Sequence, residues 1–253
     1  MINLIAYTLA NMLLLTVAYF QYICFYSPVL LLPFIYYRNI GFSRLIESSA
    51  QPVNLINENY IYPVGDFTYY IIQSSLVETI TIYFILPIEK GSTNLIYFIP
   101  MSFFFEIVLD FFYYWIHRAL HVSHYSAHKL HHEHIHLKPV IHFYQDIVDL
   151  FLTIVLPLVF TVKIVEQFYS LSHFEISVLL TYKIITEVSG HSGHRTFPFS
   201  SFPQADFIPK LLGIELYSED HNLHHSQVNY NFSKRFILWD KVFGTYKSPV
   251  IQT

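Results

Sequence analysis

Sulfur is almost absent from this chain. Cys24 is the single cysteine in 253 residues, and it lies within an apolar run. The chain therefore forms no internal disulfide, carries no thiolate metal cluster and has no pair of redox thiols. We expect any metal ion to be held by nitrogen and oxygen atoms.

Charge is scarce as well. Only 13% of the residues are charged, about half the share in an average soluble domain, whereas 53% are hydrophobic and 19% are aromatic. The formal net charge of −4 is small and mixed along the chain, without a basic stripe or an acidic tail. This composition predicts an integral membrane protein and argues against a nucleic-acid partner.

The N-terminal segment has no charged residue before Arg38. That length exceeds the ~20 residues that cross a bilayer. A signal peptide would begin with basic residues and have a shorter apolar run, so we interpret this segment as a retained span. Pro28 and Pro33 are predicted to end its helix and to turn the remainder along the membrane interface. Residues 37–66 are predicted to form a polar loop.

Further apolar segments follow, and two of them flank a sequence with the composition of a tight turn, "EKGSTN". The approximate boundaries are 67–88, 95–116, 147–162 and 171–188. We expect the first two to form a helical hairpin. The chain is thus predicted to be an all-α membrane protein, with about four to five transmembrane or partly immersed helices and a helical cap at one end.

The distribution of Lys and Arg predicts the orientation. If the histidine-rich segments face the cytosol, all of the 14 cationic residues lie inside except Lys90 and Lys163, which lie outside, and Lys183, which lies in a span. The positive-inside rule therefore favours a cytosol-facing cap.

Histidine is concentrated in short clusters. The stretch "HRALHVSHYSAHKLHHEHIH" begins at His117 and includes His121, four residues later, on the same face of a helix. Two HxxHH clusters repeat this spacing, and they consist of His128, His131 and His132, and of His221, His224 and His225. A single HxxxH pair is more often a solvated or core feature, and a histidine-rich loop can produce one HxxHH. Three such clusters beside membrane segments favour a site with enough ligands for two metal ions.

The clusters also leave two other classes of protein open. The sequence "HEHIH" matches the HExxH pattern of zinc proteases, in which the glutamate, here Glu133, activates water. A protease would leave the cluster that begins at His221 without a role, and Lys138 and Pro139 interrupt the helix that the pattern needs. A non-enzymatic zinc-binding membrane scaffold or transporter is the third class. Transporters usually place such ligands in mid-span, whereas these clusters follow the ends of spans.

The order HxxxH, HxxHH, HxxHH resembles the fatty acid hydroxylase and sterol desaturase superfamily of membrane di-iron oxygenases. The resemblance covers roughly residues 100–247, through "DFFYYWIHRALH", "HKLHHEH", "GHSGHRTFP" and "DHNLHHSQVNYNFSKRFILWDKVFGTY". The last segment is most similar to the sterol 25-hydroxylase and sterol C4-methyl oxidase branches. Relatives often carry Tyr-x-His-Pro-x-Glu after the second cluster. This chain reads "FYQDIVD" there, with Gln145 and Asp146 at the His and Pro positions and Asp149 as a candidate replacement for the glutamate, which leaves the substrate open.

The resemblance implies a function and its cofactors. These are hydroxylation, desaturation or oxidation at an unactivated C–H bond of a sterol, fatty acyl or other lipid, with two iron ions and O₂ as co-substrate. The electron donor is expected to be a separate protein, such as a cytochrome b5 or a reductase, because no nucleotide fingerprint, haem motif or cysteine cluster is found. The implied location is the endoplasmic reticulum membrane. Residues 1–95 would form an N-terminal membrane region, and residues 96–253 the histidine-box di-iron hydroxylase domain.

The resemblance also adds His191 to the candidate ligands, with His194 as a weaker candidate. The expected metal ligands are His117, His121, His128, His131, His132, His191, His221, His224 and His225. Asp110, about two helical turns before His117, is predicted to orient an imidazole by accepting its second N–H. The remaining histidines are expected to lie outside the site, and they are His124, His134, His136, His142 and His173.

Overall fold

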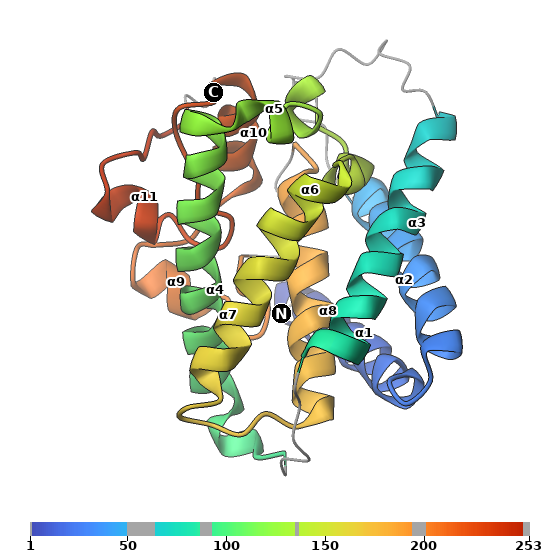
Figure 1. The fold of residues 1–253 in the computed structure, drawn as a ribbon. Coiled ribbons are helices and arrows are strands. Elements are labelled where there is room, and N and C mark those ends of the chain that lie inside the picture. The colour runs from blue at the N-terminus through green and yellow to red at the C-terminus, as the bar shows by residue number, and fades with distance from the viewer. Residues whose placement is uncertain (1, 50–63, 87–92, 135–136, 194–200, 250–253) are drawn as a thin grey trace.

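Helices dominate the structure, a computed structural model that describes residues 2–49, 64–86, 93–134, 137–193 and 201–249 (Figure 1). The longest are α1 (Ile2–Cys24), α2 (Pro28–Ser49), α3 (Val64–Ile80), α4 (Leu95–Ser123), α7 (Leu156–Val165) and α8 (His173–Gly190). Shorter helical elements are η1 (Thr81–Ile85), α5 (Tyr125–His128), η2 (His131–Glu133), η3 (Pro139–Phe143), α6 (Ile147–Leu150), η4 (Phe151–Val155), α9 (Phe207–Leu211), α10 (Ser218–Ser226) and α11 (Leu238–Val242). Among the described residues, β pairing is limited to an isolated bridge between Glu215 and Phe236. The predicted all-α class is confirmed.

The second helix corrects one prediction. Pro28 begins α2 rather than ending the preceding helix, and Pro33 lies inside α2, which continues through the predicted polar loop as far as Ser49. Arg38, Asn39 and Ser43 are buried in this part, whereas Arg44 and Glu47 are exposed. Arg38 is buried, and its guanidinium donates to Gln21 on α1 at 2.6 Å and to Glu78 on α3 at 2.6 Å. A polar residue with partners on adjacent helices permits a helix where composition alone predicts a loop.

The centre of the bundle is α8. It begins with a capping box, in which Ser172 and Glu175 each satisfy the other's backbone N–H, and every residue from Glu175 to Ser189 is buried. α1 packs against α8, α3 packs mainly against α2, and α4 packs against α7. The predicted hairpin of the 67–88 and 95–116 segments is therefore wrong. The apolar face of α4, with Phe105 and Leu109, shares a core with Leu158 of α7 instead.

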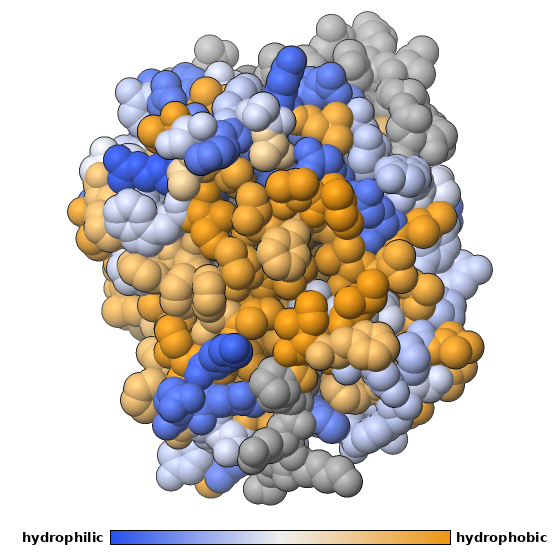
Figure 2. Space-filling model, viewed as in Figure 1, coloured by the Kyte–Doolittle hydropathy of each residue, from blue (hydrophilic) through white to orange (hydrophobic). Residues whose placement is uncertain are grey.

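Membrane association is visible in both length and surface. Leu4–Cys24, Ile96–Ser123 and Ile147–Val165 are long and apolar enough to cross a bilayer. Figure 2 shows a broad hydrophobic band across the middle of one face, with hydrophilic residues gathered above and below it. Large apolar side chains are exposed on these helices, as at Leu9, Ile96 and Phe151. The predicted membrane class agrees with this surface.

Candidate metal centre

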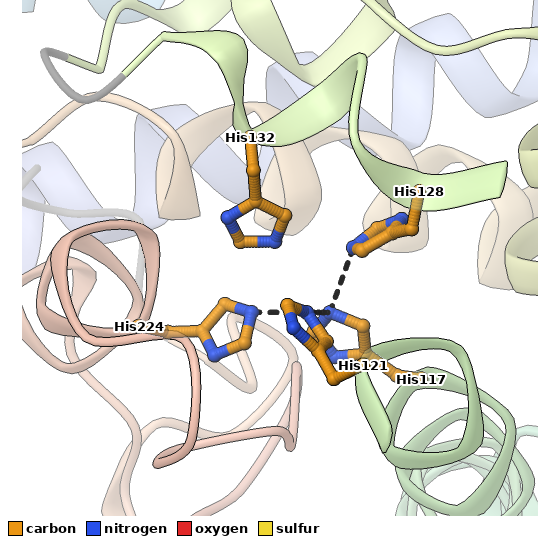
Figure 3. A group of neighbouring side chains, drawn as sticks. All are labelled: His117, His121, His128, His132 and His224. Atoms are coloured by element: carbon orange, nitrogen blue, oxygen red, sulfur yellow. Dashed lines mark hydrogen bonds between the residues drawn. The ribbon is translucent and has the colours of Figure 1, made fainter. Parts of the chain in front are cut away.

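Nine histidines converge at one end of the bundle, where the end of α4 meets α5, η2, α10 and the end of α8. Within each of two groups, one nitrogen from every ring lies within 4.8 Å of the others. Figure 3 shows the first group, whose side chains point toward one another from α4, α5, η2 and α10. Its members are His117, His121, His128, His132 and His224. The second group is His131, His191, His221 and His225. All nine predicted ligands are thus brought together.

The HxxHH spacing divides each cluster between the two groups. On an α-helix, residue i+4 lies about 40° from residue i, whereas residue i+3 lies about 60° to the other side. His221 and His225 of α10 accordingly share the second group, and His224 points to the first. In the other cluster, His128 and His132 share the first group. One helical turn therefore serves two neighbouring sites.

Hydrogen bonds at the outer nitrogens fix the orientation of several rings. Nδ1 of His117 lies 2.7 Å from the Phe232 carbonyl oxygen, and Nδ1 of His224 lies 2.7 Å from the Tyr230 carbonyl oxygen. Nδ1 of His191 is 2.8 Å from the carbonyl oxygen of Glu187. A carbonyl oxygen only accepts, so each of these rings carries its proton on Nδ1. The Nε2 lone pairs consequently point into the two groups.

The Nε2 atoms that point into each group carry lone pairs. They lie closer together than two such lone pairs would without a cation between them. Nε2 of His117 lies 3.0 Å from Nε2 of His128 and 3.1 Å from Nε2 of His224. In the second group, His191 and His221 approach to 3.0 Å. Two nitrogens bound at ~2.1 Å to one ion, at right angles, lie about 3.0 Å apart. Imidazole-only donor sets of this kind fit divalent transition metals such as iron or zinc.

Several of these histidines lie outside the membrane-spanning helices. Burial keeps their imidazoles in the neutral form, which is the form that binds metal. Burial lowers the pKa of His191 and of His224 to about 3. The same cause, together with neighbouring imidazoles, holds the pKa of His131, His221 and His225 well below 6.5. His132 is also buried, and neither of its ring nitrogens makes a hydrogen bond to any residue that the structure describes. Its nitrogens are therefore free to act as ligands.

The lowered pKa values predict that the metal-free protein loses stability in acid. In the unfolded chain these imidazoles titrate near pH 6.5. Below that pH the unfolded state binds more protons than the folded state, so the free energy of unfolding is greatest above pH 6.5 and falls as the pH is lowered. Chelator-treated protein in detergent should unfold at a lower temperature at pH 5 than at pH 7.5. His124→Gln, at an exposed histidine, should show the same dependence, and a midpoint that stays level or rises would contradict the prediction.

The carboxylate that orients a ring is Asp149, not Asp110. Oδ1 of Asp149 lies 2.8 Å from Nδ1 of His128, and both side chains are buried. Asp149 lies one residue after the glutamate position of the family pattern, and this candidate replacement is the sequence signal that marks it. The prediction for Asp110 is wrong because its carboxylate accepts backbone N–H groups of Lys234, Arg235 and Phe236, at 2.8 to 3.1 Å. Asp110 instead ties residues 234–236 to α4, close to Phe232.

Below the histidines lies a buried network of charges. Nε of Arg235 is 3.0 Å from Glu106 on α4, and its Nη2 is 2.8 Å from Glu187 on α8. Lys183 also pairs with Glu187, at 2.9 Å. The C-terminal segment is thereby fixed to two helices. Nothing in the sequence links Arg235 to these partners, because the contact spans 48 residues or more.

The remaining described histidines belong to neither of the two groups. His124 is exposed, and His173 stacks on Phe25 with 4.3 Å between ring centroids. His134 packs against Tyr144. His142 is fully buried near Glu187, and its ring lies 5.3 Å from that of His191. His136 and His194 lie outside the described residues.

The described residues of the HExxH pattern, 132–134, do not form the helix that the pattern requires. The 3₁₀ turn η2 ends at Glu133, and His134 has extended backbone angles. The Glu133 carboxylate accepts a hydrogen bond from the Tyr144 hydroxyl at 3.2 Å, in an exposed position. His132 belongs to the first histidine group instead. Glu133 is therefore not aimed at a zinc-bound water as in a protease.

Asn231 matches the acceptor pattern for N-glycosylation, but it is closed to modification. Its side chain is 1% exposed, and Nδ2 donates to the carbonyl oxygens of Asp220 and Lys247. Its backbone has a positive φ of 56°, which asparagine tolerates better than most residues. This asparagine holds the turn that leads to Phe232.

Comparison with known proteins identifies relatives of the histidine-bearing part. The family model described as fatty acid hydroxylase matches residues 102–245. Fatty acid hydroxylase vlmA from Lecanicillium sp is 34% identical over 56% of this chain and 40% of its own length. A methylsterol monooxygenase from Dictyostelium discoideum is 32% identical over 55% of this chain and 47% of its own length. The very-long-chain aldehyde decarbonylase CER1 of Arabidopsis thaliana is 29% identical over 54% of this chain and 22% of its own length. No solved structure matches the chain significantly.

Proposed function

The chain belongs to the fatty acid hydroxylase family, and from that premise we propose that it is a membrane-bound oxygenase that hydroxylates, desaturates or oxidises an unactivated C–H bond of a lipid. The observation that carries the proposal is the pair of buried imidazole groups at the end of apolar helices. The matched relatives include proteins named for fatty acid hydroxylation, methylsterol oxidation and aldehyde decarbonylation. The chain spans less than half of the length of these three, so the activity of the whole protein is part of the proposal.

We propose that two iron ions occupy the site, one in each histidine group. Iron bound there supplies the activation of O₂ that C–H hydroxylation needs. The protein holds the imidazoles neutral by burying them and fixes their tautomers through acceptors such as Asp149 and the Phe232 carbonyl. Eight of the nine histidines are buried, which limits the access of water to the site.

We also propose a route for the substrate, an electron donor and a membrane location. The lipid substrate is expected to enter from the bilayer, and electrons are expected from a separate protein such as a cytochrome b5 or a reductase. We place the protein in the endoplasmic reticulum membrane because of its resemblance to the family. The histidines are expected to face the cytosol because most Lys and Arg residues lie on their side. Residues 1–95 would act as the N-terminal membrane region, and residues 96–253 as the di-iron domain.

Replacing Glu133 with glutamine separates this function from a zinc protease. Glu133 is exposed and belongs to neither histidine group, so the Glu133→Gln oxygenase should keep its metal content and its lipid turnover within about two-fold of wild type, as expected for a surface substitution. A protease would lose essentially all activity. Metal content and hydroxylated lipid should be measured on the same preparations.

A zinc-binding membrane protein without enzymatic activity is the remaining alternative. Elemental analysis of the purified full chain distinguishes the two, combined with O₂ consumption in the presence of an electron donor. Lipid mass spectrometry after expression in a host that lacks such oxygenases then identifies the product. Zinc without O₂ consumption or any new lipid would contradict the proposed function.

A further inference from the structure

Two ligands of the first histidine group are oriented by the same short segment of the chain. His117 comes from the end of α4, and its Nδ1 donates to the Phe232 carbonyl oxygen at 2.7 Å. His224 comes from α10, and its Nδ1 donates to the Tyr230 carbonyl oxygen, also at 2.7 Å. The position of residues 230–232 therefore decides how two rings from two helices face the centre of the group (Figure 3).

The second histidine group takes its outer acceptors from other parts of the chain. Nδ1 of His191 lies 2.8 Å from the carbonyl oxygen of Glu187 on α8. Nδ1 of His131 lies 3.4 Å from the carbonyl oxygen of Tyr144. Both acceptors precede the C-terminal segment. A change that moves only residues 230–233 should consequently disturb the first group and spare the second.

The side chain that fixes residues 232 and 233 is Asp240. It is fully buried, and its two carboxylate oxygens accept the backbone N–H groups of Phe232 and Ser233, each at 2.8 Å. The Ser233 N–H and the Phe232 carbonyl belong to one peptide unit, which is planar and trans, so they point in opposite directions. By holding the N–H, Asp240 aims the carbonyl at His117.

A chain of hydroxyl groups supports Asp240 from α4. The Thr245 hydroxyl donates to Asp240 Oδ1 at 2.7 Å. A hydroxyl has a single hydrogen, so the Tyr114 hydroxyl, 3.0 Å from Thr245 Oγ1, must be the donor of that second bond. Tyr114 in turn accepts from Nη1 of Arg118 at 2.9 Å. Because Tyr114 lies three residues before His117, the chain of hydrogen bonds starts and ends on the same helix.

A carboxylate suits this position better than any neutral side chain. Asp240 receives three donors, and an ionised carboxylate only accepts, so each donor is satisfied. An asparagine would turn its NH₂ group toward one of them. Hydrogen bonds to an ionised acceptor are also roughly twice as strong as neutral ones. The peptide unit that serves His117 is thus held firmly.

We propose that Asp240 and Thr245 are positioning residues for the first histidine group. They hold the Phe232 carbonyl on Nδ1 of His117, so that the proton of this ring stays on Nδ1 and Nε2 remains available to a metal ion. The inference rests on the proposed two-metal site and adds the residues that maintain one half of it. A purely structural role predicts a different result, because α10 carries ligands of both groups and a general loosening would weaken both.

Cobalt binding distinguishes the two groups in the full chain. The protein is purified in detergent, stripped of metal with a chelator and titrated with Co²⁺, whose visible absorption reports each site that it fills. His224→Ala removes a ligand of the first group, and His225→Ala removes one of the second. Each of these variants therefore shows the spectrum and affinity of the group that remains, and wild type should show both.

Asp240→Asn should weaken Co²⁺ binding to the first group about ten-fold or more, as is typical when the partner behind a metal ligand is lost. Binding to the second group should stay within about two-fold of wild type. Thr245→Val removes one neutral hydrogen bond and should cost about two- to ten-fold at the first group, whereas Thr245→Ser keeps the hydroxyl and should bind like wild type. Asp206→Asn, at a carboxylate that pairs with Lys210 on the protein surface, should change neither group.

Equal weakening of both groups in Asp240→Asn overturns the proposal, because that result indicates support of the fold alone. Unchanged affinity of the first group in both Asp240→Asn and Thr245→Val also overturns it. The two Thr245 variants decide the question if Asp240→Asn does not fold. Lipid turnover of the iron-loaded wild type is measured separately. A protein that shows the expected cobalt pattern but oxidises no lipid contradicts the proposed function alone.

Discussion

Replacing His128 with alanine should abolish metal loading and lipid turnover while the protein still inserts into membranes. His128 contributes one nitrogen to the first histidine group, 3.0 Å from that of His117. Removing a hydrogen-bonding partner behind a metal ligand typically costs 10 to 100-fold in metal affinity or activity, so removing the ligand itself should cost about 100-fold or more. Elemental analysis of the purified protein and mass spectrometry of its lipid product measure the two effects.

His224→Ala offers an independent version of the same experiment, because its ring reaches the first group from a different helix, α10. A matched control is His124→Ala, four residues before His128 and exposed to solvent, which should retain both metal and activity. Product formation at the wild-type rate in both the His128→Ala and the His224→Ala proteins would rule out the assigned site.

The convergence of eight of the nine histidines could be predicted because it follows from local spacing, whereas His191 was added by the family resemblance. Histidines three and four residues apart must share a helix face, and membrane helices limit where those faces can meet. The division into two groups is equally local, since it follows from the angle between His224 and His225 on one turn of α10. The all-helical fold could be predicted for a similar reason, since backbone groups in lipid must be satisfied within each segment.

The partners of the ligands could not be predicted in the same way. The acceptor for His117 is a backbone carbonyl, that of Phe232, and a carbonyl leaves no signature in the residue type. Asp110 was expected to serve a ring because it lies on the correct face of α4. That face also meets residues 234–236, whose backbone N–H groups use the carboxylate first. The predicted pairing of the 67–88 and 95–116 helices was wrong for a related reason. An apolar face such as that of α3 can pack against more than one neighbour, and here it packs mainly against α2.

Arg235→Met should produce the largest loss of stability of any single substitution outside the histidines. Arg235 is 1% exposed and is held by carboxylates of both α4 and α8. Removing one partner of a buried ion pair typically costs about 3 to 5 kcal/mol, because the remaining charge stays buried without compensation. Here Glu106 loses its ion pair with Arg235, whereas Glu187 keeps Lys183. Denaturant unfolding of the purified protein in mixed micelles measures the change.

A second substitution tests whether the uncompensated charge is the cause. In the Arg235→Met background, Glu106→Gln removes that charge and should recover about half of the lost stability or more. Arg44→Met, at an exposed arginine of α2, should change the free energy of unfolding by less than about 0.5 kcal/mol. Failure of Glu106→Gln to restore stability would show that packing around the arginine, not charge, dominates. Because Phe232 lies three residues before Arg235 and orients His117, the single variant should also lose metal, and the double variant should regain it together with stability.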